Sequence, residues 1–364
     1  MWENPPARDQ KHCSPDDVRK TMSALMPDLA RYWQRPLHAY ASVVYDVDPF
    51  RSDCPERVCA MQRLAACIER VAIRAGFTAQ EAKDASSQIL ASPVLQTGPH
   101  CLLVIEPDAF YTHLFSLLGL KAQGRKWHIQ YGVSTTSYIE SGKKGPGWLE
   151  LQGVAHNLFG LPRRRMDGRS ICCPNGPHSF RLTDLTDSMA PKASAARLRR
   201  YLPLDDFPSA AEAIKAGNQA LWKSRFATPV RLLQLDDFDV ADLIADHLED
   251  PQSWLSAHFI TDGATAKAIS NAIDDLNAGP WRGWIRRTTD FFWRIKAGRV
   301  VPLHFQDGAL RSDGPSNFQI SFEPSSLVEA LRAREILPNL FMVFLVLSIL
   351  PGTRNSRTTR ANCC

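Results

Sequence analysis

The 364-residue sequence lacks the short motifs that identify the commonest nucleotide and metal sites. It contains neither the G-x-G-x-x-G fingerprint of dinucleotide-binding folds nor the G-x-x-x-x-G-K-S/T phosphate loop, so neither kind of nucleotide site has its usual signature. It also has no C-x-x-C pair, the spacing that structural zinc sites commonly use. We therefore predict no metal site, and the sequence leaves the cofactor unknown.

Long apolar segments are missing as well. The first ten residues are polar and include Pro5 and Pro6, so no secretory signal is predicted there. The longest apolar run is Leu340–Leu350, in which Ser348 is polar, whereas a helix needs about 20 apolar residues to cross a bilayer. Without a signal, the cysteines are expected to be thiols in a cytoplasmic protein.

The composition is that of a folded protein. Hydrophobic residues make up 44% and charged residues 22% of the chain, which excludes a disordered or fibrous protein over most of its length. The net charge of +5 is mild. Basic residues dominate from Lys121 to Arg200 and acidic residues from Leu204 to Asp275, which predicts either an anion-facing middle segment or two segments that neutralise each other.

Helix signals dominate the first 90 residues. Ser14 precedes a proline-led helix start, and Thr78 with Glu81 forms a capping box. Between them, Pro55 opens a segment with apolar residues at helical spacing. The β-branched run Ala41–Val47 is predicted to be a strand.

The pattern then changes to strand, helix, strand. Two apolar runs, Val94–Gln96 and Cys101–Ile105, are separated by a predicted turn at Thr97–His100. A helix is expected from Pro107 to Gly119, and Trp127–Val133 should be a strand. This order is typical of a parallel βαβ unit. We predict an α/β fold in which a Rossmann-like βαβ region is joined to an additional helical region.

The second half of the chain is predicted to be mainly helical. Asp237–Glu249 is one expected helix, a β-hairpin turns at Ala297-Gly298, and Ser326–Glu329 is a capping box. Leu340–Leu350 is expected to be a buried helix or a core strand. The predicted organisation is a helical N-terminal region (1–90), the Rossmann-like region (91–190), a helical and β-hairpin region packed on it (191–352) and a polar tail (353–364).

The strand-end sequence around His100 is the first candidate site. Open α/β sheets bind ligands at the carboxyl ends of their strands. His100 is therefore a candidate for acid–base catalysis, and His113 on the following helix is a second candidate. The alternative is that both histidines are simply hydrogen-bonded in structural positions.

Basic residues supply two further candidates. Lys143 and Lys144 flank a glycine turn, and Arg163, Arg164 and Arg165 form a consecutive run. Both groups have the charge to bind a phosphate or a carboxylate. Solvent-exposed residues would give the same pattern, and three consecutive arginines cannot all face one ligand.

Three other groups have simpler explanations. Cys172 and Cys173 are expected to be small buried residues. The acidic residues from Asp236 to Asp246 are expected to begin a helix and line its solvated face. The aromatic and arginine residues of segment 281–294 are expected to pack in a core with a basic rim, although the same mixture is also used to stack bases.

Two short segments of the sequence are similar to segments of one known protein family. In Leu95–Leu120 an apolar strand, a Thr-Gly turn and a helix containing Phe110 follow one another, and Arg334–Leu340 is the second segment. They resemble the cysteine-adding synthases of bacillithiol formation. This resemblance implies a Rossmann-like core, condensation of cysteine with a sugar malate conjugate, and a ligand-binding turn at Thr97 and Gly98. It implies no catalytic residue.

The leading hypothesis is an intracellular ligase or group transferase of specialised metabolism that acts on a small anionic metabolite. The predicted ligand positions are Thr97, Gly98, His100, Lys143, Lys144 and one of Arg163–Arg165. Two alternatives remain. One is a nucleic-acid-binding protein that uses the basic segment 121–200, and the other is a peripheral membrane protein anchored by its last 25 residues.

Overall fold

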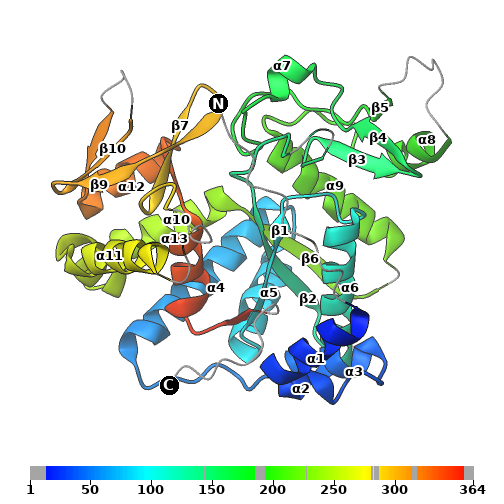
Figure 1. The fold of residues 1–364 in the computed structure, drawn as a ribbon, viewed down its shortest axis with the longest axis horizontal. Helices are drawn as coiled ribbons and strands as arrows, with labels where there is room; N and C mark the ends of the chain where they lie inside the picture. Colours follow the sequence, from blue (N-terminus) through cyan, green and yellow to red (C-terminus); the bar gives the residue numbers. More distant parts are fainter. Residues whose placement is uncertain are drawn as a thin grey trace.

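The computed structural model describes residues 14–140, 142, 144–184, 193–226, 228–279, 282, 287–313 and 318–355. The fold is mixed α/β, as predicted from the order of strand and helix signals. Its centre is a parallel sheet with the strand order β13-β1-β2-β6 (Figure 1). These strands are β1 (Val94–His100), β2 (Trp127–Val133), β6 (Arg231–Leu235) and β13 (Arg354–Asn355).

Helices cover both faces of this sheet (Figure 1). Alternate side chains of β2 point to opposite faces: Ile129 packs in the core with α4 and α5, whereas His128 contacts residues of α6 and α9. Since α6 connects β1 to β2, these three elements form the predicted parallel βαβ unit. The four helices are α4 (Pro55–Arg74), α5 (Ala79–Ala91), α6 (Pro107–Ala122) and α9 (Ala210–Arg225).

The face of the sheet beneath α6 and α9 is polar at its centre. Gln96, Gln130 and Gln234 are register partners on β1, β2 and β6, and all three are buried. Ser116 on α6 donates to Gln96 Oε1 at 2.9 Å, and Asn218 on α9 donates to Gln234 Oε1 at 3.0 Å. Because buried amides need hydrogen-bond partners, this layer helps to fix both helices on the sheet.

The other described elements surround this central unit. Three antiparallel sheets have the strand orders β3-β4-β5, β12-β7-β8 and β11-β10-β9. Their strands are β3 (Trp148–Leu151), β4 (Val154–Asn157), β5 (Thr183–Asp184), β7 (Phe292–Lys296), β8 (Arg299–Pro302), β9 (His304–Gln306), β10 (Ala309–Arg311), β11 (Gln319–Ser321) and β12 (Ile336–Pro338). The helices are α1 (Pro15–Leu25), α2 (Pro27–Ala30), α3 (Leu37–Tyr45), α7 (Arg163–Met166), α8 (Ala193–Arg199), α10 (Asp237–Leu248), α11 (Ala264–Ala278), α12 (Pro324–Arg332), α13 (Leu340–Phe344) and the π-helices η1 (Leu255–Thr261) and η2 (Leu345–Ile349).

Several local predictions are confirmed. Ser14 and Thr78 each accept a hydrogen bond from the backbone N–H three residues later, at 3.1 Å from Asp17 and 3.3 Å from Glu81. Both acidic side chains also accept from the N–H of the capping residue, so each pair forms a capping box. The hairpin predicted around Ala297-Gly298 is present as β7 and β8.

The strand predicted at Ala41–Val47 is wrong, because most of this segment belongs to helix α3. Tyr45 of α3 packs tightly on Gly119 of α6, where an added Cβ would lie 2.3 Å from the Tyr45 ring. This tertiary contact outweighs the strand preference of the valines. The helix α6 also continues past Gly119, where the sequence predicted its end, and stops at Ala122.

The turn predicted at Thr97–His100 is also wrong. β1 continues through the Gly-Pro pair, and its register against β2 shifts there. Thr97 pairs with Tyr131 and His100 with Val133, so β1 has one residue more than β2 in this stretch. Such a β-bulge accommodates a proline, which has no N–H for the sheet.

Two further boundaries differ from the prediction. Cys101–Ile105 is not a strand but part of the connection from β1 to α6. Helix α12 begins at Pro324 and not at the capping box predicted at Ser326–Glu329. A proline in the first turn costs no intrahelical hydrogen bond, so it is a strong helix start.

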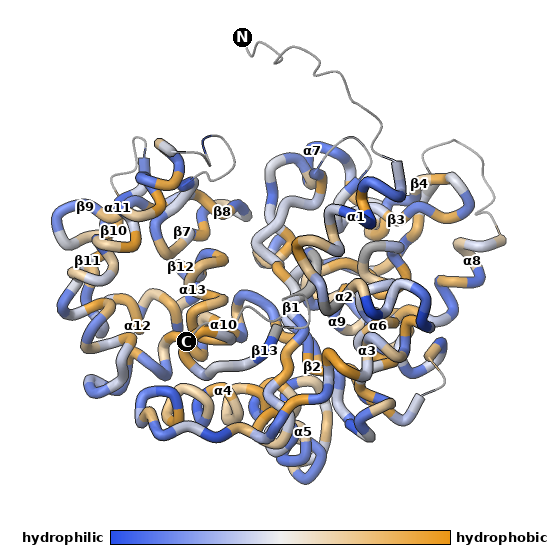
Figure 2. Tube along the Cα trace, turned by 60° about the horizontal axis from the view of Figure 1, so that its bottom comes forward, coloured by the Kyte–Doolittle hydropathy of each residue, from blue (hydrophilic) through white to orange (hydrophobic). Residues whose placement is uncertain are grey.

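The apolar run Leu340–Leu350 is a buried helical segment, one of the two forms predicted for it. It comprises α13 and η2, and its side chains Met342, Val346 and Leu347 are fully buried in the core shared with α4 and α10. The chain is predominantly hydrophobic around α13 and β12 (Figure 2). Within the residues that the structure describes, no helix is long and apolar enough to span a membrane.

The central sheet is completed immediately after this run. Arg354 and Asn355, which the sequence assigned to a polar tail, form β13 and pair with Val94 and Leu95 of β1. The N–H of Arg354 also donates to Pro93 O at 2.7 Å. The terminal pair Cys363-Cys364 lies outside the described residues.

We expect Leu347→Ala to lower the free energy of unfolding by about 2–5 kcal/mol, because it empties a fully buried position. Ile349→Ala is the matched control: Ile349 lies on the same helical segment but is 55% exposed, so its loss should cost less than about 0.5 kcal/mol. Denaturant unfolding measures both variants. Equal, small effects would contradict the core position of this segment.

Candidate functional site

A pocket of about 340 Å³ lies at the carboxyl ends of β1 and β2 and at the start of α10. This edge of an open parallel sheet is where ligands typically bind, and the volume is in the range of small-molecule sites. We call it the carboxyl-edge pocket. Its sheet side is formed by His100, Tyr131, Thr135 and Asp237, and its opposite wall includes Arg287, Trp293 and Phe341.

Asp237 ties the end of β2 to the start of α10. Its carboxylate accepts hydrogen bonds from the Tyr131 hydroxyl at 2.8 Å, from the N–H and hydroxyl of Ser134 at 2.6 and 2.9 Å, and from the N–H of Thr135 at 2.9 Å. Burial nevertheless raises the pKa of Asp237 to about 6, although the hydrogen bonds from Tyr131 and Ser134 lower it. This carboxyl group therefore titrates close to neutral pH.

His100 is the last residue of β1, and its side chain is 45% exposed. Its Nδ1 contacts Glu140 Oε1, which lies on the chain segment after β2. A carboxylate that binds Nδ1–H fixes the imidazole tautomer and leaves Nε2 able to exchange a proton. The N–H of Glu140 donates to Lys144 O at 3.0 Å, so the turn that carries Lys144 lies next to this pair.

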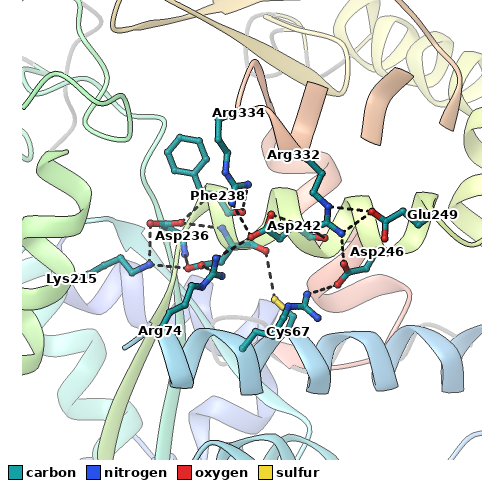
Figure 3. A network of polar contacts seen from close by, with 12 residues as sticks. Cys67, Arg74, Lys215, Asp236, Phe238, Asp242, Asp246, Glu249, Arg332 and Arg334 are labelled. Atoms are coloured by element: carbon teal, nitrogen blue, oxygen red, sulfur yellow. Dashed lines mark hydrogen bonds and ion pairs between the residues drawn. The ribbon is translucent and has the colours of Figure 1, made fainter. Parts of the chain in front are cut away.

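The start of α10 is held by buried charges (Figure 3). Asp236 caps the helix by accepting from the N–H groups of Phe238 and Asp239 at 3.0 and 3.2 Å. Lys215 on α9 donates to Asp236 at 3.1 Å and to Asp239 at 2.8 Å. Burial alone would lower the pKa of Lys215, but the two carboxylates raise it above its ordinary value, so the lysine stays charged.

Further along α10, arginines pair with the acidic side chains of the helix (Figure 3). Arg74 on α4 donates to Asp239 at 2.7 Å and to Asp242 at 3.1 Å. Arg334 donates to Asp242 at 2.9 Å, and Arg332 on α12 donates to Asp246 at 2.7 Å. The prediction that these acidic residues line a solvated face is therefore wrong, because their partners come from α4, α9 and the α12 region.

The predicted neutralisation of the basic segment by the acidic segment does not take the form of direct ion pairs among the described residues. Among the residues that the structure describes, no ion pair joins the segment Lys121–Arg200 to the segment Leu204–Asp275. The carboxylates of α10 are paired with cations from outside the basic segment.

His113 is not brought to the carboxyl-edge pocket. It is buried on α6, where its Nδ1 lies 2.9 Å from His128 Nε2 and its ring packs edge-on against Trp222. Burial lowers the pKa of His113 to about 4, so it is neutral near pH 7. This pair belongs to the polar layer between the sheet and the helices α6 and α9, away from His100.

The predicted arginine run also lies outside the pocket lining. Arg163, Arg164 and Arg165 are exposed on the short helix α7. Arg163 pairs with Asp167 at 3.8 Å, and Arg165 donates to Asn175 O at 2.9 Å.

The remaining predicted ligand positions divide into three groups. Thr97 is buried within β1 and Gly98 lies in the same strand, so they do not form the expected ligand-binding turn. Lys144 is exposed next to Glu140. Lys143 lies outside the described residues.

Two predictions about nearby side chains can be assessed from burial. Cys172 and Cys173 are both fully buried, as expected, with their sulfur atoms 3.9 Å apart. Phe291 and Phe292 are core residues, as expected. Trp281 lies outside the described residues.

Sequence reasoning missed Glu140 and Tyr131, and it gave Asp237 and Arg287 different roles. The signal for Asp237 was present, because two carboxylates, Asp236 and Asp237, follow strand β6 at the ligand-binding edge of the sheet. Glu140 had no local signal, since only the folded chain brings it to His100.

No protein-family model matches the chain, and a comparison with curated proteins finds no match. The resemblance to cysteine-adding synthases therefore stays a prediction. Within the described part of the chain, no group of three or more histidine, cysteine, aspartate or glutamate side chains is arranged to hold a metal ion.

Asp237 should make folding stability depend on pH. Its folded pKa of about 6 lies above its ordinary 3.8, so the unfolded state loses this proton first and stability falls as pH rises from about 4 to 6. Asp237→Asn removes this contribution. Relative to wild type, the variant should gain about 2–3 kcal/mol across that range.

Unfolding measured at a series of pH values checks this expectation. The asparagine amide would face the Tyr131 hydroxyl, which is able to accept, while its carbonyl oxygen keeps the bonds from Ser134 and Thr135. A stability difference between the two proteins that does not change with pH would contradict the raised pKa.

Proposed function

We propose that the protein is an enzyme acting on a small anionic metabolite that binds in the carboxyl-edge pocket. The observation that carries this proposal is the contact with Glu140 made by His100, which lines the pocket at the carboxyl end of β1. A histidine whose Nδ1 is held by a carboxylate has the arrangement used in general acid–base catalysis. His100 Nε2 would exchange the proton with the substrate.

The pocket wall opposite the sheet supplies a cation. Arg287 pairs with Asp274 at 2.7 Å and with Asp290 at 3.0 Å, which holds its guanidinium in place at the wall. An anionic group would bind to its remaining N–H donors. The charge of Asp237, which also lines the pocket, is partly compensated by its four hydrogen bonds from Tyr131, Ser134 and Thr135.

The rest of the wall suits an apolar part of the ligand. Trp293 and Phe341 present aromatic surface next to Arg287. A pocket with few polar groups among apolar walls is typical of a site that orients one small molecule. The proposed substrate therefore has an anionic end and an aliphatic or ring portion.

The reaction class is the part of the proposal that the sequence resemblance supports. Both resembling segments contribute to the carboxyl-edge pocket: His100 comes from Leu95–Leu120, and Asn339 and Leu340 come from Arg334–Leu340. We accordingly propose ligation or group transfer, and a Rossmann-like classification of the β1-α6-β2 unit. The membrane hypothesis gains no comparable support, since Met342, Val346 and Leu347 of the C-terminal apolar run are core residues.

The first test is thermal unfolding against a panel of carboxylates, sugar phosphates, amino acids and a short DNA duplex. A ligand that binds the folded state at about 100 times its Kd should stabilise it by about 2.7 kcal/mol. For a small anion at fixed ionic strength, His100→Ala should abolish this shift without lowering the stability of the free protein, because His100 is partly exposed.

His38→Ala is the matched control, because it removes an exposed histidine on α3 outside the pocket. It should leave the shift intact. A full shift in the His100→Ala variant would refute the assigned site. A shift given only by DNA and lost in salt would replace the enzyme by a nucleic-acid-binding protein.

A further inference from the structure

A second pocket, of about 400 Å³, lies at the opposite edge of the central sheet. It is formed where the chain enters β2 and β6, at the amino ends of these strands. Its lining includes the end of α6, the segment Gly124–Trp127, the segment Pro229–Arg231 and Asp84 on α5. We call it the amino-edge pocket. It shares no lining residue with the carboxyl-edge pocket.

Cations dominate the amino-edge pocket. Lys121, Arg125, Lys126 and Arg231 line it together with one carboxylate, Asp84. Arg231 is paired with Glu81 at 2.8 Å and lies over the Trp127 ring at 5.4 Å. Within the described chain, Lys121, Arg125 and Lys126 have no ion-pair partner, so the pocket carries an excess of positive charge.

The position of α6 explains only part of this charge. Lys121 lies in the last turn of the helix, where a cation interacts favourably with the helix dipole. Lys126 instead directly precedes β2, and Arg231 begins β6. Neither residue is at the end of a helix, so the helix dipole does not explain its charge. Arg125 lines the same pocket, and its guanidinium donates to Ala91 O at 3.5 Å. The helix dipole therefore accounts for Lys121 alone among the four cations.

The backbone frame of the pocket is held in place without a ligand. The side-chain oxygen of Gln88 accepts from the N–H groups of Lys126 and Trp127 at 2.8 and 2.9 Å, and its amide donates back to Trp127 O at 2.7 Å. The N–H of Arg231 donates to Lys126 O at 2.8 Å, which joins the two walls. Such preorganisation lowers the cost of binding.

We propose that the amino-edge pocket binds a phosphate-bearing small molecule. The unpaired cations surround a space larger than one phosphate group needs, and guanidinium and ammonium groups are the usual phosphate ligands. This site is independent of the reaction proposed for the carboxyl-edge pocket.

Isothermal titration of the full-length protein with inorganic pyrophosphate tests the proposal, at one fixed ionic strength. The double variant Lys121→Ala/Lys126→Ala should bind at least about tenfold more weakly, since two charge-assisted contacts are lost. Both lysines are exposed, so the variant should fold normally, which circular dichroism checks. His100→Ala should bind pyrophosphate as wild type does, because His100 lies at the other edge.

Lys20→Ala/Lys267→Ala is the matched control. It removes the same charge from two exposed lysines on α1 and α11 that do not line the pocket. Unchanged affinity in this control, with weaker binding in the pocket variant, supports the site. Equal losses in both double variants would reveal only a general charge effect and overturn it. Absence of binding by the wild-type protein, or full binding by the pocket variant, would overturn it as well.

Discussion

The ion pairs along α10 are the constraint on which the rest of the structure depends. Lys215 and Arg74 reach Asp239 from helices on opposite faces of the central sheet, and Arg332 reaches the same helix from α12. Removing Lys215 would leave the buried carboxylate of Asp236 without its cation, which is far more costly than losing a surface pair. These ion pairs therefore position α4, α9 and α12 against α10. The first turn of α10 carries Asp237, so the geometry of the carboxyl-edge pocket follows from this arrangement of charges.

Much of the central unit was accessible from the sequence because its signals are local. The capping boxes, β2 and the order of β1, α6 and β2 depend on spacing between near neighbours. The wrong predictions concern segments whose conformation depends on contacts with residues distant in the sequence. Residues 41–45 are helical, and Tyr45 packs on Gly119 of α6. β1 continues through a proline where its register against β2 shifts. The candidate site divides in the same way: His100 was indicated by its strand-end position, whereas Glu140 meets it only after folding.

The central sheet relates two chemically different edges. At one end of β2, Tyr131 lines the carboxyl-edge pocket, whose opposite wall is partly aromatic. At the other end, Lys126 and Trp127 line the amino-edge pocket, which is basic. The cations of the amino-edge pocket thus lie apart from the acidic groups of α10, which are paired with Arg74 and Lys215. The basic pocket and the acidic helix α10 lie at opposite ends of the central strands.

The pairing of β1 with β13 has a consequence for how the protein is made. Val94 finds its partner Arg354 only after most of the chain has been synthesised. Ribosomes add about 5–20 residues per second, so the outer edge of β1 stays without its neighbour for many seconds on each nascent chain. An uncovered strand edge is a template for pairing with another molecule. Until Arg354 and Asn355 dock on Val94 and Leu95, this edge of β1 is open to such pairing.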